Sequence, residues 1–346
     1  MSRSEEIFEI LREELVSGKY TAGTRFPSEQ KLMHRFGVSR ITINKVTSLL
    51  VSDGYILRGK KGAGTLVADS SPFPLGTFAY AGPIDNDYSI QIINALQYHA
   101  FQNGYALSIF SPGAELMQYC IDRIRSSRYL GLFVTGIGVL PADYKLPFPL
   151  VYLDNGLPKG SIPRHSVTCT NAQGAADMAK ALLDKGHREI LIFSSYTLIE
   201  FSRKERIRSF MEILTAGGVP HVENRFFHVK SPRRYSEAKR ILEKALEQFS
   251  GTTAILTDSD HIAFLLLRIL HDKGLDKQIT VTGFGALSGN YGLHRIPSVD
   301  QHPEEIALQG FTRMLQLLKD PGLEPTEIRV KTELINPDCI PEVNKK

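Results

Sequence analysis

The amino-terminal part of the chain alternates apolar and polar positions with the period of short amphipathic helices. Apolar residues from Ile7 to Leu15 predict a helix over residues 4–17. Two further helices are predicted on either side of the turn FGVS, with Ser28 and Ser39 as their N-caps. After them, YILR and TLVA predict two short strands that form a hairpin around the glycine-rich tip GKKGAG.

Beyond residue 76 the pattern changes to short apolar strands that alternate with helices. Strands are predicted at TFAYAG, YALSIF, LGLFVT, PLVYL, EILIFS, TAILT and ITVTGF, and helices at 88–102, 115–126, 172–185, 203–217, 261–274 and 304–319. Such alternation indicates an α/β architecture, with parallel sheets covered by helices on both faces. Because the segment is longer than one ordinary sheet needs, we expect two lobes with a cleft beyond the carboxyl ends of the strands.

These two patterns define the expected domains. Residues 1–68 form the first domain, and the short stretch at 69–76, which contains both Ser and Pro, is the predicted linker. Residues 77–346 form the two-lobed domain. The hydrophobic content of 42% is ample for packed cores in both.

The net charge of +4 comes from the first domain alone. Lys and Arg number 11 against 7 Asp and Glu up to Ala68, whereas the remainder is balanced at 30 against 30. Between Gln30 and Ala68 the ratio is 7 to 1. This sign is expected of a surface that meets phosphates, although a solvated basic face has the same composition.

The third predicted helix buries one apolar stripe and turns a hydrogen-bonding face outward. A helix, a short turn and a second helix form the helix-turn-helix arrangement, in which the second helix reads bases in the major groove. Arg can bond guanine and Asn adenine, Ser and Thr can bond phosphates, and the hairpin would be a wing. The same spacing also occurs in proteins that never bind nucleic acid. The predicted DNA-binding residues are Ser28, Ser39, Arg40, Ile41, Thr42, Asn44, Lys45, Lys60, Lys61 and Gly64.

The pattern G(x)4RFPSEQKL(x)3FGVSRITI(x)13G(x)4GAGTLV, within residues 4–68, resembles the winged-helix domain of the GntR family of bacterial transcription regulators. The resemblance implies that Arg40 is the DNA-contacting arginine of the VSR motif and that Gly64 is the glycine at the wing tip. Asn44 departs from the family pattern, which usually has arginine at this position, so the base preference at that step is expected to differ.

Polar side chains cluster in the loops that follow the predicted strands of the second domain. Carboxylates, amides and arginine next to aromatic residues suit the hydroxyl groups of a sugar. Taken singly, Asp260 is equally suited to a helix N-cap, Asp87 to a turn and Arg206 to a surface ion pair. The predicted effector-binding residues are Asp85, Asn86, Asp87, Tyr88, Asn155, Asn171, Arg206, Asp258, Asp260 and Gln301.

Residues from about 76 to 337 resemble the effector domain of the LacI/GalR regulators, which shares its fold with periplasmic sugar-binding proteins. The stretches that carry this resemblance are ALLDKGHREILIFS, R(x)3F from Arg206, TAILTDSDHIAFLLL, ITVTGFG and SVDQHPEEIALQGFTRMLQLL. The resemblance implies that Arg206 and Asp260 contact the effector. The sequence departs from the family at GFGA, where GFDD is usual, and at Thr170 and Asn171, where aspartate and asparagine are usual.

Enzyme signatures are weak in this sequence. GKKGAG lacks the Lys-Ser/Thr of a Walker motif, GIG at 136–138 lacks a third glycine in register, and G-x-S-x-G and HExxH do not occur. Asp258 and Asp260 could form an acid/base pair, but they lack a partnered nucleophile or metal. The three cysteines are too widely spaced for a zinc site or a disulfide framework. We therefore expect neither an enzyme nor a bound cofactor or metal.

Together these features predict a ligand-responsive transcription regulator. We expect a homodimeric repressor of a carbohydrate-utilisation operon that binds a near-palindromic operator and is released by a monosaccharide or its derivative. A transcriptional activator and a sensor of a non-sugar ligand remain alternatives with the same architecture. No signal peptide or membrane-spanning apolar run occurs, so a cytoplasmic location without membrane contact is expected.

Overall fold

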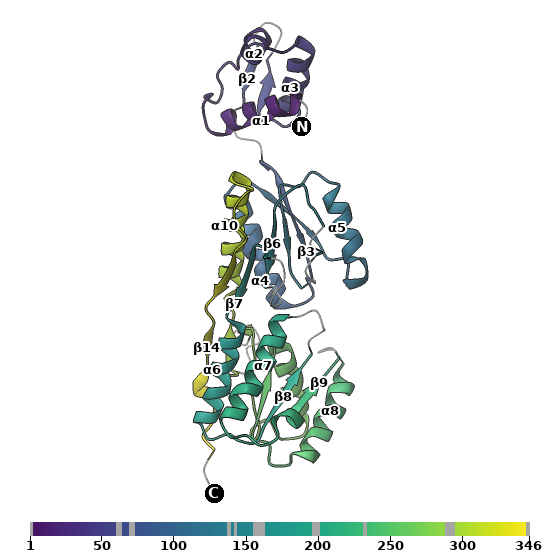
Figure 1. Ribbon diagram of the computed structural model, residues 1–346, viewed down its shortest axis with the longest axis vertical. Coiled ribbons are helices and arrows are strands. Elements are labelled where there is room, and N and C mark those ends of the chain that lie inside the picture. Colours follow the sequence, from purple (N-terminus) through teal and green to yellow (C-terminus); the bar gives the residue numbers. More distant parts are fainter. Residues whose placement is uncertain are drawn as a thin grey trace. The chain divides into compact units, whose positions relative to one another are not determined.

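The computed structural model describes residues 3–59, 64–68, 73–136, 140–141, 144–154, 163–195, 201–230, 234–287 and 295–343. The chain divides into two compact units, and Figure 1 shows the elements of each. The N-terminal unit comprises residues 1–76 together with 104–106, and the C-terminal unit comprises 77–103 and 107–346.

The N-terminal unit is a small helical domain with a hairpin. The hairpin strands are antiparallel, with Ile56 opposite Val67. Ile7, Leu32 and Leu50 are fully or almost fully buried in its core, as the helical periodicity of the sequence predicts. Its elements are α1 (Arg3–Val16), α2 (Glu29–Phe36), α3 (Arg40–Ser52), β1 (Ile56–Arg58) and β2 (Thr65–Val67).

An ion pair joins α1 to the end of α2. Arg35 Nη1 donates to Glu14 Oε2 at 2.7 Å, and Tyr20 Oη donates to the same oxygen at 3.0 Å. The hydrogen bond from Arg35 is the main cause that lowers the pKa of Glu14 to about 2. This charged contact holds α2 in place at the domain surface.

The turn between α2 and α3 depends on local capping. Ser28 accepts a hydrogen bond from Lys31 N, and Ser39 accepts one from Thr42 N, so both predicted N-caps are confirmed. Gly37 ends α2 in the left-handed region at φ +64°, and its N–H donates to Met33 O. α3 therefore begins after a short turn.

The first lobe of the C-terminal unit is a six-stranded sheet in the order β13-β7-β6-β5-β3-β4. Phe78 and Phe133 point to one face, where their rings contact Phe311 of α10, and Ala79 and Leu132 pack with α5 on the other. Figure 1 shows α10 and α5 on either side of these strands. The elements are β3 (Thr77–Ala81), α4 (Asp87–Gln102), β4 (Ala106–Phe110), α5 (Met117–Arg125), β5 (Leu132–Val134), β6 (Leu150–Leu153), β7 (Ser166–Cys169), α10 (Pro303–Lys319) and β13 (Glu327–Val330).

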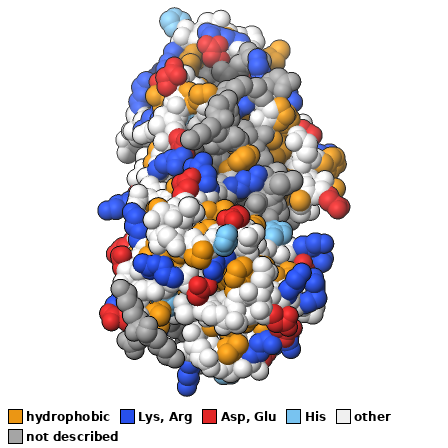
Figure 2. All heavy atoms as spheres, turned by 60° about the horizontal axis from the view of Figure 1, so that its bottom comes forward, with side chains coloured by type: hydrophobic (Ala, Val, Ile, Leu, Met, Phe, Trp, Pro, Cys, Tyr) orange, Lys and Arg blue, Asp and Glu red, His pale blue; other side chains and the backbone are white. Residues whose placement is uncertain are grey.

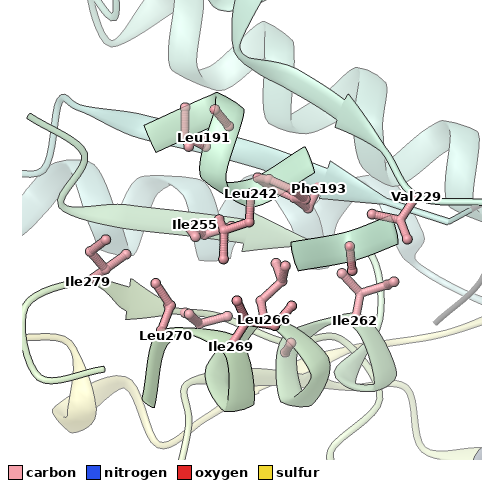
Figure 3. Close-up of a cluster of buried hydrophobic side chains, with 14 of the residues drawn as sticks. Leu191, Phe193, Val229, Leu242, Ile255, Ile262, Leu266, Ile269, Leu270 and Ile279 are labelled. Atoms are coloured by element: carbon pink, nitrogen blue, oxygen red, sulfur yellow. The ribbon is translucent and has the colours of Figure 1, made fainter. Parts of the chain in front are cut away.

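The second lobe is built on a four-stranded sheet in the order β11-β10-β8-β9. Leu191, Phe193 and Ile255 from its strands pack against Leu242 of α8 and Leu266 of α9 (Figure 3). The elements are α6 (Asn171–Asp184), β8 (Ile190–Ser194), α7 (Phe201–Ala216), β9 (Phe226–His228), α8 (Tyr235–Gln248), β10 (Ala254–Thr257), α9 (Asp260–Asp272) and β11 (Thr280–Val281).

The chain crosses between the lobes after β7, after β12 (Ser298–Asp300) and after β13. The third crossing leads into β14 (Glu333–Ile335), which pairs with β12. At the first and third crossings the hydroxyl groups of Thr170 and Thr332 are 2.9 Å apart. These crossings are the candidate hinge.

Some elements were not predicted from the sequence. The helix α8 was not predicted, although Leu242 and Ala245 are buried and Ile241 and Leu246 pack beside them in an amphipathic pattern. Strands β9, β12, β13 and β14 are three or four residues long and pair with segments distant in sequence. The predicted strand ITVTGF is shorter than expected, since only Thr280 and Val281 form a strand.

Two surface-related features of the described residues are the length of the helices and the distribution of charge on the face that Figure 2 draws. Of the helices the structure describes, none is long and apolar enough to cross a bilayer. The face drawn in Figure 2 carries Lys and Arg side chains interspersed with Asp and Glu. This mixture agrees with the balanced charge of the sequence beyond Ala68.

Candidate nucleic-acid interface and ligand cleft

The outward face of α3 carries five of the predicted DNA-binding residues. Ile41 is 83% exposed, Arg40 and Lys45 are exposed, and Thr42 and Asn44 are half-buried. Because the core stripe of the helix lies on its opposite side, this face is available to a partner of the domain.

Glu29, at the start of α2, holds two of these side chains. Arg40 Nε donates to Glu29 Oε2 at 3.2 Å. The Asn44 amide, oriented with its nitrogen toward the carboxylate, donates to Glu29 Oε1 at 2.6 Å. Glu29 was not predicted as a site residue, because its partners belong to another helix and only the turn brings them together.

A groove lies between the amino ends of α2 and α3 and the strand that follows the hairpin tip. Ser28, Arg40 and Gly64 line it, together with Arg25, which sequence analysis did not assign. Gly64 has φ +77°, and a Cβ atom there would meet no heavy atom within 4 Å. Backbone conformation, not crowding, therefore favours glycine here. Lys60 and Lys61 lie outside the described residues.

The cleft between the lobes of the C-terminal unit is the main candidate ligand site. Its empty space is about 730 Å³, part of which is open to solvent. The lining residues come from both lobes: Pro83, Asn86, Tyr88, Ser89, Thr135, Gly136, Asp154, Phe201, Ser202, Arg203, Arg206, Ser259, His261, Phe284, Gly285, Leu287 and Gln301.

Arg206 is the centre of the hydrogen-bond network at the back of the cleft. It is only 3% exposed, and its guanidinium lies 3.8 Å above the ring of Phe284. Nε donates to Asn171 Oδ1 at 2.7 Å, Nη1 to the backbone oxygen of Asp258 at 2.8 Å, and Nη2 to Gln301 Oε1. Asn171 and Gln301 follow different crossings, so one side chain joins two parts of the candidate hinge.

Asp258 and Asp260 are buried but do not line the cleft. Asp258 Oδ2 accepts from Ser194 Oγ at 2.5 Å. Asp260 accepts from Ser298 Oγ at 2.6 Å and from Leu287 N at 2.5 Å. Burial raises the pKa of Asp260, and these two hydrogen bonds oppose that shift. Both carboxylates therefore accept hydrogen bonds from groups of the second lobe.

The other predicted residues are divided between the cleft and its surroundings. Asn86 and Tyr88 line the cleft, and Asn86 also caps α4 by accepting from Ser89 N at 2.9 Å. Asp85 and Asp87, which precede and follow Asn86 in the chain, are not among the lining residues. Asn155 lies outside the described residues.

Thirteen of the 17 lining residues were not predicted from the sequence, and three of them are informative. Ser202 Oγ donates to Asp154 O at 3.2 Å and so connects the second lobe to the first. Arg203 Nη1 lies 3.8 Å from Asp258 Oδ2. Ser259, between the two predicted aspartates, is the member of DSD that lines the cleft. Arg206 and the two aspartates of DSD were predicted, but the sequence did not say which of their neighbours face inward.

The cleft wall is chemically mixed. Guanidinium, hydroxyl, amide and carboxylate groups lie beside Tyr88 and Phe284. Burial is the main cause that raises the pKa of Tyr88 well above its usual value, so this hydroxyl is neutral. Among the described residues, no group of His, Cys, Asp and Glu side chains is arranged to hold a metal ion. The arrangement suits a small molecule with several hydroxyl groups.

Comparison with known proteins agrees with both units. Residues 3–67 match the family "Bacterial regulatory proteins, gntR family", and residues 179–337 match the "Periplasmic binding protein-like domain". The chain thus carries a GntR helix-turn-helix domain followed by a periplasmic-binding-protein-like domain, as its sequence motifs suggested.

Two similar proteins are named "Arabinose metabolism transcriptional repressor". The one from Halalkalibacterium halodurans is 23% identical over 303 residues, covering 79% of this chain and 78% of its own. The one from Geobacillus stearothermophilus is 20% identical over 344 residues and covers 93% of each chain. The chain therefore resembles these repressors over most of its length.

Solved structures of LacI-type regulators share the fold. A periplasmic binding protein/LacI transcriptional regulator from Alkaliphilus metalliredigens, complexed with D-xylulofuranose, has a TM-score of 0.66 at 16% identity, covering 75% of this chain and 97% of its own. A LacI family regulator from Enterococcus faecium with bound ribose has a TM-score of 0.64 at 17% identity, covering 75% of this chain and 97% of its own. At these identities the likeness establishes the fold.

Removing the Asp260 carboxylate is expected to destabilise the protein. In Asp260→Ala, Ser298 Oγ and Leu287 N lose a buried acceptor, which should lower the free energy of unfolding by about 2–4 kcal/mol. The adjacent Ser259→Ala removes only a hydroxyl at the cleft wall and should change stability by less than about 1 kcal/mol. Urea denaturation of the full chain measures both; equal effects would contradict these separate roles.

Proposed function

We propose that this chain, with its GntR-type reading domain and periplasmic-binding-protein-like domain, is a sequence-specific repressor of a carbohydrate-utilisation operon. A small sugar or sugar derivative releases it from its operator. The observation that carries this proposal is the presence, in one chain, of an outward helix of the helix-turn-helix type and a two-lobed cleft lined by hydroxyl-binding groups.

The names and ligands of the similar proteins support the class of effector. Two are repressors of arabinose metabolism, and two structural neighbours hold D-xylulofuranose or ribose. In this chain Asn86, Asp154, Arg206 and Ser259 offer donors and acceptors from both sides of the cleft. We assign them to effector hydroxyl groups.

The proposed switch is a change in how the lobes meet. An effector that contacts both cleft walls favours one arrangement of the crossings, and this arrangement holds the reading domains of a dimer at a spacing unsuited to the operator. Linkage then requires that operator DNA weaken sugar binding by the same factor by which sugar weakens operator binding.

We further propose that the chain forms a homodimer through α4. From residue 88 to 102 this helix has no Asp, Glu, Lys or Arg. Tyr98 and Phe101 are 61% and 64% exposed, and Ile90 lies on the same side by helical spacing. Exposed apolar faces without charge are typical of interfaces, and a second copy would give the two-fold symmetry of a near-palindrome.

We place the protein in the cytoplasm, where the operator is, and do not assign it an enzymatic activity. Both oxygens of Asp260 and one oxygen of Asp258 accept hydrogen bonds from neighbouring groups, and neither residue lines the cleft. A non-sugar sensor and an activator have the same architecture. The ligand measurement below separates a sugar effector from a non-sugar one.

Arg40→Ala is expected to weaken operator binding by about tenfold or more, since a guanidinium that bonds a base edge is lost. DNA selected from a random duplex library by the wild-type protein is the probe, and fluorescence anisotropy gives the affinity. Arg3→Ala removes the same charge from an exposed ion pair on α1 and should change binding far less. If both variants lost the same operator affinity, Arg40 would contribute only its positive charge and not a contact with a base edge.

A sugar effector should stabilise the protein against thermal unfolding. In a panel of pentoses, hexoses, deoxy sugars and their phosphates, a ligand at about a hundred times its dissociation constant adds roughly 2.7 kcal/mol. The same ligand should lower DNA affinity and remain chemically unchanged. A ligand that is consumed would indicate an enzyme. A stabilising ligand that raises DNA affinity would indicate co-repression. No response to any sugar would indicate a non-sugar effector.

A charge on the α4 face should dissociate the proposed dimer. Phe101→Glu places a carboxylate in an apolar interface, so sedimentation should show monomers at concentrations where the wild type is dimeric. Tyr119→Glu on α5 changes a residue with 63% exposure and is the matched control, which should remain dimeric. A dimeric Phe101→Glu variant would exclude this face.

A further inference from the structure

Ile41 occupies an unusual position for a large apolar side chain. It is 83% exposed and stands in the first turn of α3. By the period of the helix it points about 180° away from Leu50 and about 140° away from Val46, both of which are fully buried. Ile41 therefore projects directly outward from the core of the N-terminal unit.

The side chains around Ile41 are polar, and several have protein partners. Arg40 and Asn44 contact Glu29, and Ser48 Oγ accepts from Arg58 Nη2 of β1 at 3.1 Å. The β-branched side chain of Ile41 has a restricted χ1 angle in a helix, so its methyl groups have a defined direction. An exposed apolar side chain with few rotamers thus stands within this polar face.

We propose that Ile41 is a specificity-determining residue that reads the 5-methyl group of a thymine in the operator half-site. This inference rests on the proposed DNA-binding function. In the major groove, the thymine methyl is the apolar feature that distinguishes base edges, and apolar side chains contact it. The contact removes both the thymine methyl group and the exposed Ile41 side chain from water. Burial of each apolar surface favours binding.

The proposal predicts the effect of removing a single methyl group from DNA. Full-length wild-type protein first selects its preferred duplex from a random library. Each thymine is then replaced by uracil, one position at a time, first in one half-site and then in both. Uracil keeps the hydrogen-bonding edge and lacks only the 5-methyl group. At one thymine position, we expect the change in a single half-site to weaken binding about fourfold. The same change in both half-sites should weaken binding about fifteenfold.

Ile41→Ala should bind the thymine and uracil duplexes with nearly equal affinity, because the partner of the methyl group is missing. This variant should keep the thermal stability of the wild type, since Ile41 is exposed and alanine favours helices. Val16→Ala, which shortens an apolar residue of α1 with 41% exposure, is the matched control and should keep the full sensitivity to uracil.

Two results would overturn the inference. One is wild-type binding that no uracil substitution weakens, and the other is the same sensitivity to uracil in Ile41→Ala as in the wild type. Either result would leave the proposed DNA-binding function intact, because the selected duplex is still bound. A selection that enriches no sequence would instead remove the proposed function together with this inference.

Discussion

The buried guanidinium of Arg206 is the interaction on which the C-terminal unit depends. A cation removed from water is tolerated only when its donors are satisfied, and three oxygen atoms and the face of Phe284 do so here. Two of these oxygens belong to Asn171 and Gln301, which follow separate crossings between the lobes. Because Arg206 also lines the cleft, a ligand that draws on its donors changes the contacts that hold the candidate hinge.

In the N-terminal unit, the outward face of α3 is organised by an exposed carboxylate. Glu29 fixes Arg40 and Asn44, the two side chains best suited to base edges, before any partner is present. Ion pairs at such exposed positions contribute little to stability, so DNA can replace the contact at small cost. The arrangement reduces the conformational freedom of the readers without binding them tightly, while Ile41 stays available.

The sequence predicted local features well, because caps and helical faces depend on neighbours along the chain. Ser28, Ser39 and the outward face of α3 are where periodicity indicated. In DSD, by contrast, the motif was identified but the inward residue was not. These residues form the turn from β10 to α9, in which Ser259 lines the cleft while Asp258 and Asp260 are buried away from it. That choice depends on the packing of Leu287 and Ser298, which lie far along the chain.

The first glycine of GFGA is shared with the usual GFDD, whereas Gly285 and Ala286 stand where the two aspartates are usual. A Cβ atom on Gly283 would lie 1.9 Å from Asp260 Oδ1, so glycine allows that carboxylate to reach its partners. Gly285, at φ +141°, lines the cleft and adds no side-chain acceptor to the wall of the second lobe. This wall presents mainly donors from Arg203 and Arg206, whereas the carboxylate of Asp154 comes from the first lobe. A hydroxyl group both donates and accepts. A ligand rich in hydroxyl groups is therefore read best when it bridges the two walls, which couples recognition to the arrangement of the lobes.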